Sequence, residues 1–158
     1  MSAEWGATDA GYVPLFDRLI DEELHRKHEP KPLRTLDRAG LIDSIGRELL
    51  RLFAARCTVT GDVALSRTRT VLDYGLPDLD WGARALIPEP RLRLARILRE
   101  TIQAFEPRLA NVHVEVRDTG EVSGKLAAVI EGYLVTGEVN EPISFMLPIG
   151  SGTGANGG

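Results

Sequence analysis

The hydrophobic pattern of this chain changes its period once, between residues 105 and 111. Before the change, apolar residues of the segment 91–105 recur every three or four positions, as they do on one face of a helix. This set is Leu94, Leu98, Ile102 and Phe105. From Asn111 onward apolar and polar residues alternate, which indicates half-buried strands. Helices followed by a run of strands favour an α+β fold.

Two further helices are predicted before this one. The segment 41–57 carries a single apolar stripe, and a shorter helix is expected at about 15–27, beginning after Pro14. Pro30 and Pro32 end the short helix and form a stiff linker. A helix this short is marginal alone, so it must dock on its own domain or on a partner.

Three strands are predicted after the change of period. They cover 112–117, 126–135 and 142–147, with turn-forming residues between them. Two successive hairpins give a three-stranded antiparallel meander. Pro142 near the start of the last strand places it at an edge, because proline has no N–H to donate. The predicted fold class is therefore α+β, with two main helices plus a short N-terminal helix packed on a three-stranded antiparallel β-meander.

The chain of 158 residues is long enough for one domain with a core of its own. We expect a flexible N-terminus at 1–13, a short helix with a proline-containing linker at 14–35, one folded domain at 36–149, and a disordered glycine-rich tail at 150–158. The single cysteine, Cys57, allows no internal disulfide. Its place in an apolar pattern favours a small core residue.

Charge and hydropathy narrow the surroundings in which this protein works. The net charge is −4, which argues against general nucleic-acid binding. No apolar run approaches the roughly 20 residues that a membrane span needs. The N-terminus lacks the basic start and apolar core of a signal peptide. We expect a soluble, cytoplasmic protein with no nucleic-acid partner and no membrane span.

The sequence contains no convincing pattern for a cofactor, a metal or a catalytic centre. Residues 152–157 formally match G-x-G-x-x-G, but that fingerprint must follow a strand and open a helix. His25 and His28 lie three residues apart, without the third ligand that a zinc site needs. His113 is expected to face solvent from the first strand. We therefore predict no cofactor, no metal and no catalytic residues.

The segment 58–90 leaves more than one interpretation open. Gly61-Asp62 is typical of a turn, and 71–79 is typical of an ordered connector packed on the core. A loose acidic set lies in or near it: Asp73, Asp78, Asp80 and Glu89. Paired carboxylates can perform acid–base hydrolysis, so a muramidase-type hydrolase is one alternative. Turn capping and solvated charge are the other.

The stretch Glu106-Pro107-Arg108 ends the last helix. Proline fixes its own φ and disfavours helical backbone in the residue before it, so Glu106 is expected at the helix end and Arg108 leaves at a set angle. One interpretation is an ordinary helix stop with two solvated charges. The other is a stiff corner that grips a partner chain, because arginine gives planar, bidentate recognition.

Three motifs of the chain, taken in order, resemble one protein family. They are Leu15-Phe16-Asp17-Arg18-Leu19, then Val71-Leu72-Asp73-Tyr74-Gly75-Leu76-Pro77-Asp78-Leu79, then Phe105-Glu106-Pro107-Arg108-Leu109. Together they look like TssE, the baseplate subunit of type VI secretion systems. TssE is related to the wedge protein of contractile phage baseplates, which is sometimes labelled lysozyme-like. The resemblance covers about 14–149, and its first motif favours the secretion system over a phage.

This resemblance implies a structural role rather than an enzymatic one. The family sits in the cytoplasmic baseplate beside wedge subunits like TssF and TssG, and contractile sheath assembly starts on it. The implied mechanism is β-augmentation, in which strands of the first sheath subunits extend the sheet of this protein. By the same resemblance, the partner-binding residues are Glu106, Pro107, Arg108, Tyr74, Gly75, Pro77 and Asp78. The alternatives are the equivalent sheath initiator of a contractile phage tail or extracellular injection particle, and the muramidase-type hydrolase.

Overall fold

The structure is a computed structural model that describes residues 11–12, 35–77, 88–119, 126–136 and 139–149. The short helix and linker predicted before Thr35 fall outside these ranges, as does the glycine-rich tail. The chain of elements runs from β1 (Gly11–Tyr12) and β2 (Thr35–Leu36) to the last strand, β7 (Val139–Ile149). Among the described residues, no helix is long and apolar enough to cross a membrane.

The first long helix, α2, covers Arg38–Ala54. Asp37 begins it, because its carboxylate accepts a hydrogen bond from the backbone N–H of Gly40 at 2.8 Å and satisfies a donor that the helix leaves free. The apolar stripe is buried as predicted: Leu41, Ile45, Leu49, Leu52 and Phe53. The predicted end at residue 57 is wrong, because β3 (Arg56–Cys57) pairs in parallel with β4 (Leu76–Pro77). Cys57 is buried, as expected of a small core residue.

The turn predicted at Gly61-Asp62 is also wrong, because α3 (Gly61–Ser66) begins there. Thr60 is its N-cap, and its hydroxyl accepts from the backbone N–H of Val63 at 3.5 Å. The chain then passes through a single 3-10 turn, η1 (Val71–Asp73), into β4. The second long helix, α4 (Pro88–Phe105), follows the next undescribed segment, and its apolar face is buried as the pattern predicts.

The three predicted strands form one antiparallel sheet in the order β5-β6-β7, where β5 is Leu109–Asp118 and β6 is Leu126–Thr136. β7 lies at an edge, as Pro142 predicts. The pairing of β5 with β6 shifts register between Ala110 and His113, where Asn111 adopts a positive φ of 51°. His113 is exposed, as predicted. The α+β class and the meander are thus confirmed.

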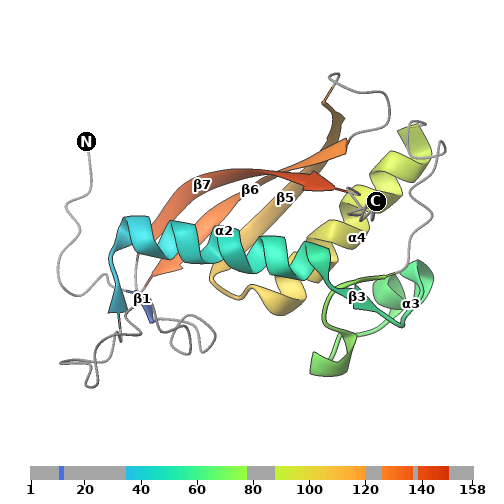
Figure 1. Cartoon of the computed structure of the whole chain (residues 1–158), viewed down its shortest axis with the longest axis horizontal. Coiled ribbons are helices and arrows are strands. Elements are labelled where there is room, and N and C mark those ends of the chain that lie inside the picture. The colour runs from blue at the N-terminus through green and yellow to red at the C-terminus, as the bar shows by residue number, and fades with distance from the viewer. Residues whose placement is uncertain (1–10, 13–34, 78–87, 120–125, 137–138, 150–158) are drawn as a thin grey trace, which may run out of the picture.

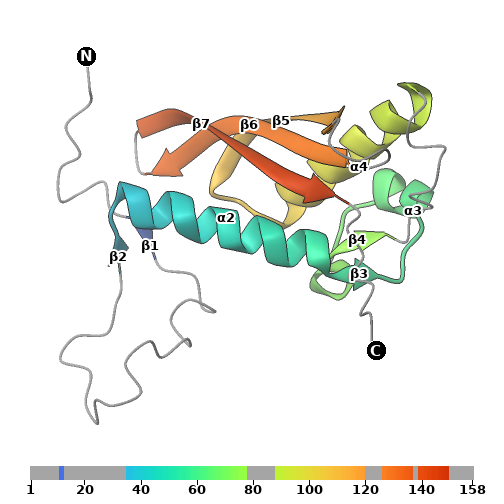
Figure 2. The same cartoon turned by 45° about the horizontal axis from the view of Figure 1, so that its top comes forward.

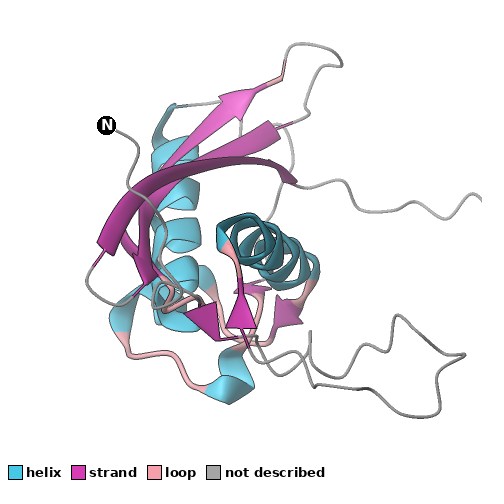
Figure 3. Ribbon diagram, turned by 90° about the vertical axis from the view of Figure 1, so that its left-hand side faces the viewer, coloured by secondary structure: helices cyan, strands magenta, loops and turns pink. Residues whose placement is uncertain are grey.

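The helices α2 and α4 lie on the same side of this sheet (Figures 1 and 3). Their buried residues and the inward-facing residues of all three strands form one core cluster. Figure 2 shows the β3–β4 pair and α3 beyond the C-terminal end of α2. At the other end of α2, Arg38 donates from Nε to both carboxylate oxygens of Glu141 on β7, at 2.8 Å each. This bridge holds the start of the helix against the edge strand.

Candidate functional site

The Glu106-Pro107-Arg108 corner forms where α4 ends. The N–H of Glu106 still donates to the carbonyl of Ile102 at 2.8 Å, so Glu106 is the first residue beyond the helix and keeps its last backbone bond. The N–H of Leu109 then donates to the carbonyl of Glu106 at 3.1 Å. These bonds close a tight turn around Pro107, and they bring Arg108 back over the side chain two residues before it.

Arg108 and Glu106 form a bidentate ion pair. Nε and Nη2 of Arg108 donate to the two oxygens of the Glu106 carboxylate at 2.6 Å each. The Glu106 side chain is only 4% exposed and that of Arg108 is 19% exposed. The interpretation as two solvated charges is therefore wrong. The carboxylate faces inward because the turn at Pro107, which is itself exposed, supplies a guanidinium at the right place to neutralise it.

The corner ties together elements that are distant in sequence. Nη1 of Arg108 donates to the hydroxyl of Ser44, a fully buried residue of α2, at 3.0 Å. The carbonyl of Arg108 accepts from the N–H of Val135 on β6 at 2.9 Å. Arg108 thus contacts α2, the end of α4 and the central strand. A change at this residue alters the fold as well as any surface that it presents.

Tyr74 and Gly75 form the second candidate group. Gly75 has a φ of 107°, and a Cβ at this position would lie 2.8 Å from the backbone of Ala55. Only glycine combines this conformation with so close an approach. The approach is fixed by the N–H of Leu76, which donates to the carbonyl of Ala55 at 3.0 Å. Gly75 and Pro77 are buried, so Tyr74 is the residue of this group that reaches the surface.

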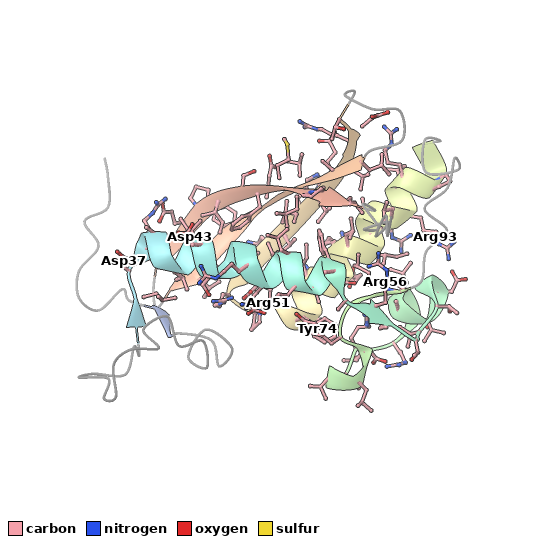
Figure 4. All side chains as sticks on the ribbon, viewed as in Figure 1. Asp37, Asp43, Arg51, Arg56, Tyr74 and Arg93 are labelled. Atoms are coloured by element: carbon pink, nitrogen blue, oxygen red, sulfur yellow. The ribbon has the colours of Figure 1, made fainter. Side chains whose placement is uncertain are left out.

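The structure brings the two groups together at the C-terminal end of α4. The ring of Tyr74 meets the ring of Phe105 edge to face, with centroids 5.3 Å apart. Burial raises the pKa of the Tyr74 hydroxyl, and the negative charges of Glu48 and Glu106 raise it further. Figure 4 shows Tyr74 below the C-terminal half of α2. Asp78, the remaining predicted contact, lies outside the described residues.

Arg69, which belongs to none of the sequence motifs described above, holds this arrangement in place. Its Nη2 donates to the carbonyls of Asp73 and Gly75 at 2.6 and 2.7 Å, and its Nη1 donates to the hydroxyl of Thr101 at 3.1 Å. Its guanidinium also lies over the Phe105 ring, 5.3 Å from the centroid. One arginine therefore binds the loop before β4 to the last turns of α4. No local pattern distinguishes it from a solvated arginine.

Asp73 is the member of the acidic set whose environment is described. Its carboxylate accepts from Nη1 and Nη2 of Arg67 at 2.8 Å each and from the backbone N–H of Thr70 at 2.9 Å. These donors, led by Arg67, hold the pKa of Asp73 far below its usual range. A carboxyl held ionised in this way is unsuited to act as a general acid. Of the two interpretations of this residue, turn capping is confirmed, although the carboxylate is buried rather than solvated.

The remaining acidic residues of that set are not described, because Asp78 and Asp80 lie outside the described ranges and the side chain of Glu89 is undescribed. Among the residues that are described, no group of three or more His, Cys, Asp or Glu side chains could hold a metal ion.

The connector at 71–79 is only partly packed on the core. Leu76 and Pro77 are buried as predicted, but Val71 and Leu72 are 86% and 87% exposed. The expectation that this apolar run packs inward is wrong for its first two residues. The 3-10 turn directs them outward, because its closing residue, Asp73, is anchored inward by Arg67.

The fold and the corner define a class of protein, a small α+β structural domain with an antiparallel sheet on two helices and its buried charges used in internal ion pairs. Residues 39–138 match the family described as "Baseplate wedge protein gp25", and the chain belongs to this family. The match runs from the start of α2 to the end of β6. It confirms the family that the three sequence motifs indicated, which is a family of structural baseplate proteins.

A chain in the solved structure of "The baseplate complex from the type VI secretion system" is 18% identical, and the alignment covers 70% of this chain and 95% of that chain with a TM-score of 0.48. No curated protein matches the sequence.

Proposed function

We propose that this chain is a TssE-like baseplate subunit of a type VI secretion system, working in the cytoplasm without catalysis. It joins wedge subunits like TssF and TssG to the contractile sheath, and it starts sheath polymerisation by accepting sheath strands at an edge of its sheet. Membership of the baseplate wedge family supports the baseplate role. The observation that carries the rest is the antiparallel meander, whose outer strands β5 and β7 each pair only with β6 in the described part of the chain.

The two edges of the meander differ in what they offer an incoming strand. Pro142 and Pro148 of β7 face Tyr133 and Ala127 of β6. Proline cannot donate, and antiparallel pairs alternate between those that exchange backbone hydrogen bonds and those that do not. We infer that the backbone groups of residues 142 and 148 point outward, so proline removes two donors from the free edge of β7. Prolines on an edge strand hinder pairing with another chain.

The same alternation identifies the groups that β5 offers. Because Tyr133 turns its backbone groups away from β7, the odd-numbered residues of β6 bond to β5. The N–H of Val135 follows this rule, since it donates to the carbonyl of Arg108. In β5, His113 and Glu115 face odd-numbered residues of β6, whereas Val114 faces Ile130. The N–H groups of Val114 and of Val116, its equivalent two residues on, are therefore directed to the free edge. We propose this edge as the one that receives the sheath strand.

The corner has a supporting role in this proposal. Glu106 is buried against Arg108, so it acts by fixing the guanidinium rather than by touching a neighbour. The exposed Pro107, the accessible part of Arg108 and the ring of Tyr74 lie at one end of α4 and form the predicted contact with the neighbouring subunit. The planar guanidinium recognises carboxylates that a lysine ammonium would bind with less geometric selectivity.

A proline substitution tests the edge. Val114→Pro removes an outward N–H from β5 without removing a ladder bond to β6, and we expect sheath assembly in cells to fail. Val114→Ala is the matched control, because it also removes the valine side chain but keeps the backbone N–H. Ser144→Pro makes the equivalent change on β7 and is expected to leave assembly intact. Normal sheath length in the Val114→Pro variant, with the fold verified by circular dichroism, refutes the proposed edge.

Family membership alone also fits the equivalent part of a contractile phage tail or an extracellular injection particle, because the family is described by its place in a baseplate wedge. The neighbouring genes distinguish the candidates. Genes for a sheath, wedge subunits and a membrane complex indicate a secretion system, whereas genes for tail fibres and a head indicate a phage. Turnover of purified peptidoglycan that disappears in the Asp73→Asn variant would favour the hydrolase instead.

A further inference from the structure

Val71 and Leu72 form an apolar surface that the proposed strand pairing does not use. They are adjacent, and their exposures of 86% and 87% exceed those of the other exposed large apolar residues described, such as Leu92 and Met146 at 67% each. Neighbouring apolar side chains that remain in water often mark a binding site. We call this pair the 71–72 tip.

The 71–72 tip is held in one conformation. The N–H of Asp73 donates to the carbonyl of Thr70 at 2.9 Å, and the carboxylate of Asp73 accepts from the N–H and the hydroxyl of Thr70 at 2.9 and 3.0 Å. Arg67 grips the same carboxylate, and Arg69 grips the carbonyl of Asp73. Hydrogen bonds from three residues, Arg67, Arg69 and Thr70, therefore hold this turn at Asp73. A surface already ordered in this way loses little conformational entropy when it binds.

The position of the tip separates it from the sheet. In Figure 1 the short green turn that carries the tip lies at the lower edge of the molecule, below the C-terminal end of α2, whereas β7 lies above α2. The pairing of β4 with β3 keeps this loop beside the C-terminal end of α2. A partner bound at the tip and a strand added to β5 can therefore occupy the protein at the same time.

The charges around the tip indicate the chemistry of its partner. The segment 66–73 contains Arg67 and Arg69 and one acidic residue, Asp73, so its formal charge is +1. The Arg67 side chain is 44% exposed, whereas that of Asp73 is 7% exposed and faces inward. The tip is thus a small apolar point on a positively charged base. Two side chains are far too few for the roughly 800 Å² per partner of a stable dimer, but they suit an anchor that fills a pocket.

We propose that the 71–72 tip inserts into an apolar pocket with an acidic rim on a wedge subunit, and so attaches this protein to the baseplate on the side opposite the sheath. The identity of the neighbour rests on the proposed function. The apolar pair supplies the anchor, and the basic flank meets the carboxylates of the rim.

The test measures binding of the full chain to the purified wedge subunits of the same gene cluster by isothermal titration calorimetry. The double variant Val71→Ser/Leu72→Ser is expected to bind at least about tenfold more weakly, because a buried anchor carries a large part of the binding energy. Leu92→Ser is the matched control, since it removes a comparably exposed leucine from α4. Its affinity is expected to equal that of the unmodified chain.

A second pair of variants tests the charge without touching the apolar residues. Thr68 is exposed on the basic flank. Thr68→Glu is expected to weaken binding to the wedge subunits, and Thr68→Lys is expected to preserve or strengthen it. This pair decides the question if the serine double variant does not fold. Unchanged affinity in the double variant, or equal effects of the two Thr68 variants, overturns the proposal.

Two further measurements separate this proposal from its neighbours. Sedimentation measures self-association of the chain alone and binding of the chain to vesicles of anionic lipid. Both are expected to be the same for the double variant and for the unmodified chain. If the tip instead mediates self-association or vesicle binding while wedge affinity stays the same, the proposal is overturned. Sheath assembly is scored in parallel with Val114→Pro. If sheath assembly is normal in the Val114→Pro variant, the proposed function is contradicted, but the affinity measurements at the tip can still be interpreted.

Discussion

The ion pair of the corner is buried unequally, and this predicts unequal costs when either partner is removed. Arg108→Met keeps the aliphatic stem but leaves a carboxylate that is 4% exposed without its cation. Stranding a buried charge in this way costs about 3–5 kcal/mol of the free energy of unfolding. Glu106→Gln keeps a carbonyl oxygen for Arg108, whose side chain is 19% exposed and reaches water. Its cost is expected to be about 1–3 kcal/mol.

The assay is urea denaturation at neutral pH, followed by circular dichroism, on the two single variants and the double variant. The slope of unfolding free energy against urea must stay constant for the comparison to hold. The double variant Glu106→Gln/Arg108→Met is expected to lose less stability than the sum of the single losses, because the second change removes the charge that the first one strands.

The order of the two single costs tests the reasoning. If Glu106→Gln destabilises the protein as much as Arg108→Met does, the unpaired guanidinium costs as much as the unpaired carboxylate, and the unequal burial does not decide the cost. If the single costs add in the double variant, the two side chains do not act as a pair at all. Ser44→Ala serves as a further control, since it removes one hydrogen bond to Arg108 and is expected to cost only about 1 kcal/mol.

Three further predictions concern stability. Gly75→Ala is expected to cost about 1–3 kcal/mol in urea denaturation, because the new Cβ would lie 2.8 Å from the backbone of Ala55 at a φ of 107°. Gly46→Ala, inside α2, is the contrast: its Cβ would lie 3.7 Å from the nearest atom, and it is expected to stabilise the protein by about 0.5–1 kcal/mol. Folding lowers the pKa of Asp73, so the contribution of its ion pair to the free energy of unfolding is complete above the ordinary carboxyl pKa of about 3.9 and is lost progressively as the pH falls below that value. The difference in stability between the unmodified chain and Asp73→Asn is therefore expected to narrow from pH 7 to pH 3. Leu98→Ala, at a fully buried position, is expected to cost about 2–5 kcal/mol by thermal unfolding, and equal losses for Leu98→Ala and Leu92→Ala would contradict the core described here.

The periodicity of the sequence was sufficient to predict the main body of the fold. The stripe of α2, the face of α4 and the alternation in the three strands are each set by the local spacing of apolar residues, so one sequence can reveal them. Pro142 placed β7 at an edge by the same kind of local reasoning. The boundaries were less accurate because they depend on caps such as Asp37 and Thr60, and on the short β3–β4 pairing, which joins residues about 20 positions apart.

The candidate site was predicted as a set of residues but not as an arrangement. Pro107 indicated a stiff corner, yet the inward turn of Glu106 depends on Ser44 and β6, which are remote in sequence. Arg69 could not be recognised, because its role comes from carbonyls that only the folded chain brings together. The exposed tip was misjudged for a similar reason: an apolar pair predicts burial unless the turn that carries it is known to point outward.

The proline pattern of β7 has a consequence for how a filament could be built on this domain. A sheet that can be extended across one side and is interrupted on the other has a direction. In the pairing proposed above, added strands enter at the β5 edge, and the prolines at 142 and 148 resist pairing at the β7 edge. Under that proposal the domain begins a polymer without becoming an internal subunit of it, and we expect the number of filaments in a cell to follow the number of these domains.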